Sequence, residues 1–194
     1  LLEAMEEGQV TVDGVSHRIP EPFCVFATQN PTGASGTQLL PDSQMDRFTV
    51  RLSIGYPAPA DEREILLSRQ KGNPLLQVRQ VVTREELLSM QQEAANVYVK
   101  PELADYIVSL VGKTRQDPMI ARGASPRATL SLGAMAKSVA YVQGRDYVLP
   151  KDIQAVFVST CAHRLLLSAE ADAKGMRAEE LLESILKSTP APRI

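Results

Sequence analysis

Several features that mark particular classes of protein are missing from this sequence of 194 residues. It contains only two cysteines, Cys24 and Cys161, which lie far apart and outside any C-x-x-C spacing. This pattern argues against a disulfide framework and against a zinc site, and it fits a reducing cytoplasm. No apolar run approaches the roughly 20 residues that a membrane helix needs, and no signal peptide opens the chain. We therefore expect no membrane partner.

An excess of charge of one sign is also missing, because 21 basic residues face 23 acidic residues and the net charge is -2. This balance provides no strong field for a nucleic acid, and no basic stripe is interleaved with aromatic residues. The chain has no internal repeat and no low-complexity tract. With 44% hydrophobic and 23% charged residues, the composition is that of a globular protein that can bury a full core.

The chain opens with "LLEAMEEG", in which the apolar residues share one face of a helix that ends at the glycine. No initiator methionine and no N-cap precede this helix, so we expect a fragment whose upstream part was removed or never included. Residues 9–19 then alternate in polarity around Asp13-Gly14, which predicts a β-hairpin. A two-residue turn pairs Val10 with His17, which we interpret as a surface histidine.

Residues 23–27, "FCVFA", form a continuous apolar run that is typical of a strand covered on both faces, as in a parallel sheet. Thr28, Gln29 and Asn30 follow at its carboxyl end, where open α/β sheets bind their ligands. Neutral amides at that position can hold a water molecule or a phosphate oxygen. The residues alone leave a second interpretation open, in which these side chains only bond to backbone groups of the loop.

A second strand is predicted at residues 48–54, where apolar and polar residues alternate after a short helical stretch at about residues 42–46. Arg47 lies at the joint, and Arg51 can share its face at the entry to the strand. The planar guanidinium group is well suited to phosphate oxygens. The alternative is that both arginines are solvated and pair with Asp46 or with a nearby glutamate.

Helical patterns dominate the rest of the chain after Pro57 and Pro59. Capping boxes, N-caps and first-turn prolines predict where these helices begin. The predicted starts are Thr83, Pro101, Ser125 and Pro150, and a last short helix covers residues 178–186.

Arg127 is unusual, because it lies in the first turn of the helix that begins at Ser125. A cation there faces the positive end of the helix macrodipole, which is unfavourable unless an anion also binds. A helix N-terminus with an added arginine forms a phosphate site. The alternative is that Arg127 reaches back to a carboxylate such as that of Asp117.

Taken together, the ordered motifs of this chain resemble those of the MoxR family of AAA+ ATPases. The resemblance covers essentially the whole chain, and several motifs at matching spacing are more specific than any one of them. The motifs are "LLEAMEEGQVTVDG", "PEPFCVFATQNP", "LPDSQMDRF", "RLSIGYP", "GASPRA", "GRDYV" and "HRLLLS".

This resemblance implies a fold and a set of roles. The fold is α/β plus all-α, namely the C-terminal half of an AAA+ P-loop NTPase core followed by a helical lid. Asn30 matches the sensor 1 residue that orients the attacking water, and Arg47 in "DRF" matches the arginine finger, for which Arg51 is the alternative. Arg127 in "SPRA" matches the sensor 2 arginine that contacts the ATP phosphates. Because a finger acts across an interface, the resemblance implies a homo-oligomeric ring, usually a hexamer.

The chain departs from the family pattern, because it contains no G-x-x-x-x-G-K-[ST] motif and no Walker B acidic strand. We therefore expect residues 1–68 to be a partial α/β core and residues 69–194 to be the complete lid. The full-length protein is expected to use ATP and Mg²⁺. The fragment, which lacks the phosphate-binding loop, is expected neither to bind ATP tightly nor to hydrolyse it.

The biological role of this ATPase is implied only by the resemblance. MoxR-like proteins are similar to chaperones that remodel or mature protein complexes, often beside partners with von Willebrand factor A domains. Two other classes stay open from the residues. One is a non-enzymatic helical interaction module, and the other is a nucleic-acid-associated AAA+ motor, against which the charge balance counts.

Overall fold

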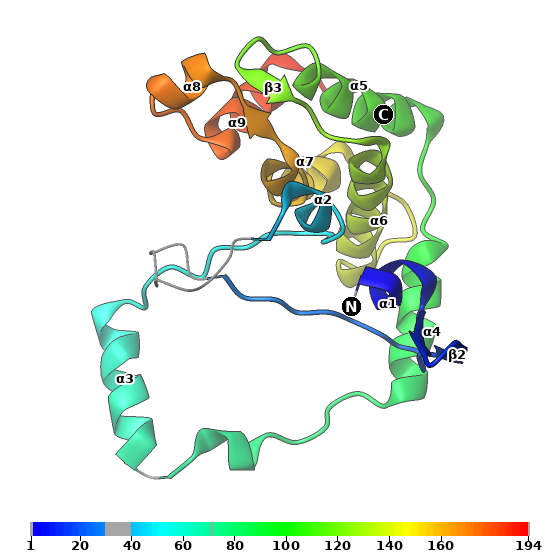
Figure 1. Cartoon of the computed structure of the whole chain (residues 1–194), viewed down its shortest axis with the longest axis vertical. Coiled ribbons are helices and arrows are strands. Elements are labelled where there is room, and N and C mark those ends of the chain that lie inside the picture. Colours follow the sequence, from blue (N-terminus) through cyan, green and yellow to red (C-terminus); the bar gives the residue numbers. More distant parts are fainter. Residues whose placement is uncertain (1, 30–39, 71, 194) are drawn as a thin grey trace.

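The structure is a computed structural model, and it describes residues 2–29, 40–70 and 72–193 of the chain. The first part contains short elements joined by extended segments (Figure 1). These are helix α1 (Leu2–Glu7), strands β1 (Gln9–Val12) and β2 (Val15–Arg18), helix α2 (Asp42–Met45), helix α3 (Pro59–Gln70) and the 3-10 helix η1 (Pro74–Gln77).

The predicted hairpin is confirmed. Strands β1 and β2 pair in antiparallel register, with Val12 opposite Val15 and Val10 opposite His17. The turn residues Asp13 and Gly14 both have positive φ, 50° and 79°. This left-handed pair gives a two-residue turn whose twist matches that of the strands it joins.

The second part is a bundle of helices α4 to α9, which we call the helical bundle (Figure 1). Helices α5, α6, α7 and α9 pack against one another, and α4 packs on α6. The bounds are α4 (Arg84–Ala95), α5 (Pro101–Thr114), β3 (Ile120–Arg122), α6 (Pro126–Val142), α7 (Pro150–Cys161), the 3-10 helix η2 (Ala162–Arg164), β4 (Leu166–Leu167), α8 (Ala169–Ala173) and α9 (Ala178–Ser188).

Local sequence signals explain where these helices begin. The side chain of Thr83 accepts from the N–H of Glu86 while the Glu86 carboxylate accepts from the N–H of Thr83, so the predicted capping box is present. Pro101, Pro126 and Pro150 each occupy the first turn of their helix, where a missing N–H costs no helical hydrogen bond. All the helix starts predicted from caps and prolines are therefore confirmed.

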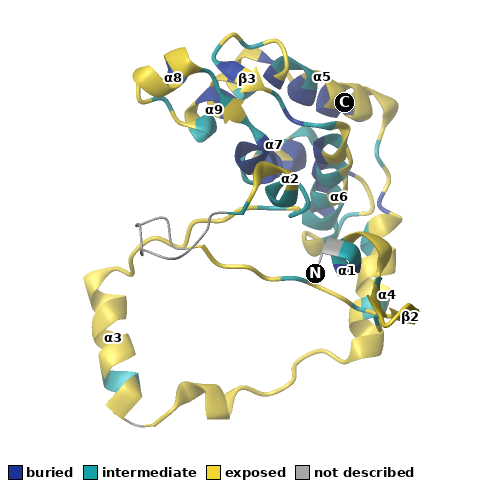
Figure 2. Ribbon diagram, viewed as in Figure 1, coloured by how far each residue is buried: buried dark blue, intermediate teal, exposed yellow. Residues whose placement is uncertain are grey.

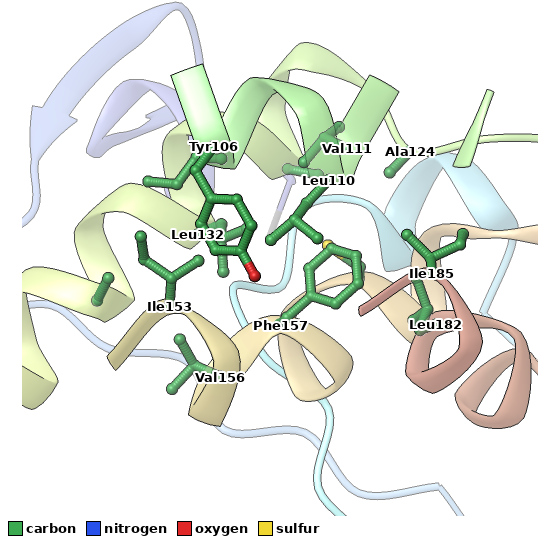
Figure 3. Packing of buried hydrophobic residues seen from close by; sticks show 14 of the residues in the cluster. Tyr106, Leu110, Val111, Ala124, Leu132, Ile153, Val156, Phe157, Leu182 and Ile185 are labelled. Atoms are coloured by element: carbon green, nitrogen blue, oxygen red, sulfur yellow. The ribbon is translucent and has the colours of Figure 1, made fainter. Parts of the chain in front are cut away.

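The hydrophobic core lies inside the helical bundle (Figures 2 and 3). Phe157 of α7 is fully buried and lies among side chains from α5, α6 and α9. The largest fully buried apolar side chains are Phe157, Leu103, Leu110, Leu132, Ile153 and Leu182. In Figure 2 the buried residues gather in these helices, whereas α3 and the segments on either side of it are exposed.

The two strands predicted at residues 23–27 and 48–54 are not strands in the structure, so these predictions were wrong for this chain. Phe26 is 91% exposed and Ile54 is 96% exposed. The cause is pairing, because a strand of a parallel sheet needs neighbours for its backbone N–H and C=O groups. Within the described residues, the strands form only the pairs β1–β2 and β3–β4.

Candidate functional site

Two arginines that are far apart in the sequence meet at one carboxylate. The Nη2 atom of Arg127 lies 2.6 Å from Oε1 of Glu6, and Nη1 of Arg47 pairs with the other oxygen, Oε2. The three side chains are partly exposed, with Arg47 the most covered at 22%. The carboxylate of Glu6 is therefore an anion held between two guanidinium groups.

Three elements bring these residues together. Glu6 lies in the last turn of α1, and Arg127 is the second residue of α6. Arg47 is the second residue after the end of α2, and its N–H donates to the carbonyl of Gln44 at 3.2 Å. The first turn of α6 contains no acidic residue of its own, so Glu6 supplies the anion that the helix N-terminus and Arg127 favour.

The electrostatics of the site agree with its geometry. Hydrogen bonds from Arg47 and then from Arg127 lower the pKa of the Glu6 carboxyl group, which keeps it ionised. Within the described part of the chain, Nε of Arg47 is shielded from solvent and has no hydrogen-bond acceptor. The site thus offers donors beyond those that Glu6 fills. A carboxylate and a phosphate present similar oxygen pairs to guanidinium groups, so the arrangement can bind a phosphate oxygen.

The other predicted site residues lie elsewhere. Arg51 pairs with Oε1 of Glu179 at 2.6 Å, and its backbone N–H donates to the carbonyl of Ser159 at 2.9 Å. The structure therefore brings Arg47 and Arg127 together but not Arg51. Asn30 lies outside the described residues. The alternative for Arg127, a pair with a carboxylate, is confirmed, but the partner is Glu6 and not Asp117, whose carboxylate accepts from the N–H of Met119.

Two protein-family models match this chain. Residues 1–50 match the ATPase family associated with various cellular activities, AAA, and residues 112–185 match the AAA lid domain. The second match covers α6 and α7 together with most of α9, so the C-terminal part of the helical bundle corresponds to an AAA lid.

Similar proteins share the whole chain. YeaC of Bacillus subtilis strain 168 is 41% identical over 99% of this chain and 60% of its own length. Chaperone MoxR1 of Mycobacterium tuberculosis is 38% identical over 100% of this chain and 53% of its own length. A crystal structure of a candidate ATPase from Cytophaga hutchinsonii has 34% sequence identity and a TM-score of 0.92, covering 99% of this chain and 61% of that one. The chain belongs to the MoxR family of AAA+ ATPases.

Membership of the MoxR family confirms the fold expected from the motifs, namely part of an AAA+ core followed by a helical lid. The chain spans between half and two thirds of the length of the relatives that it matches. From here the part of the helical bundle that matches the AAA lid model, residues 112–185, is called the lid.

The motif "HRLLLS" contributed to the MoxR resemblance, but the sequence assigned no role to its residues, which the structure places beside the two neighbours of Arg47. Arg164 of this motif is buried, and its Nη1 lies 3.0 Å from Oδ1 of Asp46. His163 bonds through Nε2 to the carbonyl of Phe48 at 2.8 Å. The motif is visible in the sequence, but no local pattern indicates that its residues contact Asp46 and Phe48, which are more than a hundred positions away.

Neither a metal-binding cluster nor a membrane-spanning helix is found in the part of the MoxR chain that the structure describes. Residues 2–29, 40–70 and 72–193 contain no group of three or more histidine, cysteine, aspartate or glutamate side chains placed to hold a metal ion. Over the same residues, no helix has the length and apolar composition that crossing a membrane requires.

Proposed function

We propose that the full-length protein is an ATP hydrolase in which Arg47 and Arg127 bind nucleotide phosphates. The observation that carries this proposal is the convergence of the two arginines on the Glu6 carboxylate. Two guanidinium groups that share one anion supply the positive charge that phosphoryl transfer requires. The family relationship supports a nucleotide phosphate as the anion that the two arginines bind in the full-length protein, because an AAA+ ATPase acts on ATP.

Each proposed residue has a distinct task. Arg47 acts as the arginine finger and stabilises charge on the nucleotide of the neighbouring subunit, while Arg127 acts as sensor 2 and contacts the phosphates. Asn30 acts as sensor 1 and orients the attacking water. Arg51 is the alternative finger, and its pair with Glu179 counts against it because that pair holds the guanidinium away from Glu6.

ATP and Mg²⁺ are the proposed cofactors of the full-length protein. The two arginines fit the phosphate groups, since their present ligand is already a carboxylate anion. When bound, the metal ion would neutralise charge between the phosphates. The chain has no G-x-x-x-x-G-K-[ST] motif, so we expect it to show no ATP turnover by itself.

We further propose that the protein works as a homo-oligomeric ring, as a hexamer in the cytoplasm, and remodels or matures protein complexes. Chaperone MoxR1 of Mycobacterium tuberculosis, which shares the whole chain, supports the chaperone-like role. Proteins with von Willebrand factor A domains are proposed partners, and nucleic acids and membranes are not. In this proposal residues 1–68 belong to the nucleotide core and residues 69–194 form the lid.

The test compares arginine variants of the full-length protein in ATP turnover and nucleotide binding. Arg47→Ala is expected to lower turnover by about 10³-fold or more and to leave nucleotide binding nearly intact, because a finger acts on the transition state. Arg127→Ala should weaken binding, turnover or both. Arg51→Ala should stay near the wild-type rate.

A matched control is Arg122→Ala, which removes another arginine from an ion pair at the surface, with Asp42 at 2.7 Å. This variant is expected to keep the wild-type rate. If Arg47→Ala left turnover unchanged across protein concentrations while Arg51→Ala abolished it, Arg51 would be the finger. If neither variant changed turnover, the proposal that Arg47 or Arg51 is an arginine finger would be wrong.

A further inference from the structure

Arg164 is a buried cation that makes four polar contacts. Its side chain is only 1% exposed, although charged side chains are almost never fully buried without partners. The guanidinium donates from Nε to the carbonyl of Thr160 at 2.9 Å and from Nη2 to Oγ of Ser131 at 3.1 Å. The remaining contacts are Nη1 to Oδ1 of Asp46 at 3.0 Å and Nη2 to the carbonyl of Phe48 at 2.8 Å.

The last two contacts lie directly on either side of Arg47. Asp46 precedes Arg47 and Phe48 follows it, so the guanidinium of Arg164 bridges the residue before Arg47 and the residue after it. Removing such a buried partner leaves an uncompensated charge or carbonyl, which is strongly unfavourable. The segment 46–48 is therefore fixed to η2 by bonds that are costly to break.

Two further lid residues hold the same segment. Oγ of Ser125 donates to both carboxylate oxygens of Asp46, at 3.2 and 3.1 Å, instead of capping α6. His163 bonds to the carbonyl that also accepts from Arg164. Helix α2 contacts η2, which brings the residues after α2 within reach of the lid.

We propose that Arg164 is a positioning residue that fixes the arginine finger to the lid of its own subunit. This inference rests on the proposed function, in which Arg47 is the finger. Because Arg127 also belongs to the lid, the lid then carries both phosphate-binding arginines as one body. A shift of the lid relative to the neighbouring subunit moves the two arginines together, and a lid without Arg164 holds Arg127 but releases Arg47.

A second buried ion pair of the lid provides a matched control. Arg145 binds Asp152 with two hydrogen bonds of 2.7 Å, and Asp152 is 1% exposed, so this pair also combines a buried group with a bidentate arginine. Its contacts lie among residues 143–152, and it bonds to no residue of the 46–48 segment. Loss of this pair should affect stability without affecting the finger.

The experiment measures kcat and KM for ATP, together with the thermal midpoint, in the full-length protein. Arg164→Met and Asp46→Asn are expected to lower kcat by about 10²-fold with little change in KM, because a misplacement of about 1 Å has this cost. Arg164→Lys keeps the charge but not the planar fork, and it should recover part of kcat. Arg145→Met should lower the thermal midpoint and leave kcat near wild type.

The combination with Arg47→Ala separates positioning from a general loss of structure. If Arg164 acts through Arg47, the double variant Arg47→Ala/Asp46→Asn should be no slower than Arg47→Ala alone. Asp46 is partly exposed, so its variant tests the contact even if Arg164→Met does not fold. An Asp46→Asn variant with wild-type kcat, beside an impaired Arg47→Ala, would overturn the positioning role and leave the proposed function standing. An unimpaired Arg47→Ala would overturn both.

Discussion

His163 and Arg164 are adjacent residues whose burial has opposite chemical consequences. Arg164 stays charged because Asp46 and two backbone carbonyls accept its hydrogen bonds. His163 bonds to the carbonyl of Phe48, which can only accept, so Nε2 carries the proton of a neutral ring. Within the described residues, Nδ1 of His163 is buried and has no hydrogen-bond partner. A second proton on this ring would place a cation in a covered site.

The titration of His163 predicts a pH dependence of folding. Burial lowers its pKa below the ordinary value, and the charges of Arg164 and Arg51 lower it further, while the Phe48 carbonyl and Asp46 act in the opposite direction. The unfolded chain binds this proton more readily than the folded chain does. The contribution of neutral His163 to the free energy of unfolding is therefore fully present above about pH 6.5 and falls as the pH drops below that value. The loss from this group is at most about 1.4 kcal/mol per pH unit.

Urea unfolding at pH 7.5 and pH 5.5 checks this expectation. His163→Gln should lose less free energy of unfolding between the two pH values than the wild type does. His17→Gln, which changes the exposed histidine of the hairpin, should behave as the wild type. Equal losses in wild type and His163→Gln would show that the stability does not depend on this titration.

At the residue level, local chemistry predicts an anion beside Arg127, whereas the catalytic roles of the site residues stay predictions. A cation in the first turn of a helix indicates an anion, and the structure supplies one from Glu6. The sequence could not name Glu6, because Glu6 and Arg127 are 121 positions apart and no local pattern encodes their contact. The same limit applies to Arg164, whose bonds reach residues near position 46.

Helices and strands differ in where the partners of their backbone hydrogen bonds come from. Helices close their hydrogen bonds within one segment, so caps and prolines were sufficient to locate α4 to α7. Strands need a partner, and an apolar run such as residues 23–27 is only one half of a pairing. The hairpin was predicted correctly because its turn brings both halves together in eleven residues of sequence, 9–19.

The junction between α5 and α6 gives a prediction for an element boundary. A Cβ atom at Gly123 would lie 2.6 Å from the carbonyl oxygen of Thr114 and 2.7 Å from Cα of Arg115. Both are backbone atoms, and the adjacent N–H of Ala124 is bonded to Oγ1 of Thr114, so neither side can give way easily. Gly123→Ala should therefore lower the free energy of unfolding by about 1–3 kcal/mol.

Gly133 is the matched control for this substitution. It lies inside α6, and a Cβ atom there would meet only Cδ1 of Ile107, at 4.0 Å. Gly133→Ala should raise stability by up to about 1 kcal/mol, because alanine is the better helix former. Denaturant unfolding of the two variants should therefore move the midpoint in opposite directions. Destabilisation by both to the same extent would contradict the close packing at Gly123.

At the scale of the whole molecule, the hydrophobic core lies in the helical bundle. The buried residues gather in α5, α6, α7 and α9, while residues 52–82 expose many apolar side chains (Figure 2). The family could be inferred from the ordered motifs, because seven short motifs at matching spacing are far more specific than any predicted element. The arrangement of residues 23–29 and 40–54 could not, since it depends on contacts that no single segment specifies.

The central claim is that Arg47 acts on the nucleotide of the neighbouring subunit. Mixed rings test it directly, since Asn30 is proposed to act on the nucleotide of its own subunit and Arg47 on the next. Arg47→Ala and Asn30→Ala full-length proteins, each nearly inactive alone, are mixed in equal amounts under conditions that exchange subunits. Random mixing then creates sites in which both residues are intact.

The account predicts that the mixture regains about a quarter of the wild-type ATP turnover, because one neighbouring pair in four combines an intact Asn30 with an intact Arg47. Turnover of the mixture should rise with time as subunits exchange. A mixture that stays at the average of the two inactive variants, in rings shown to have exchanged subunits, would contradict a finger that acts between subunits.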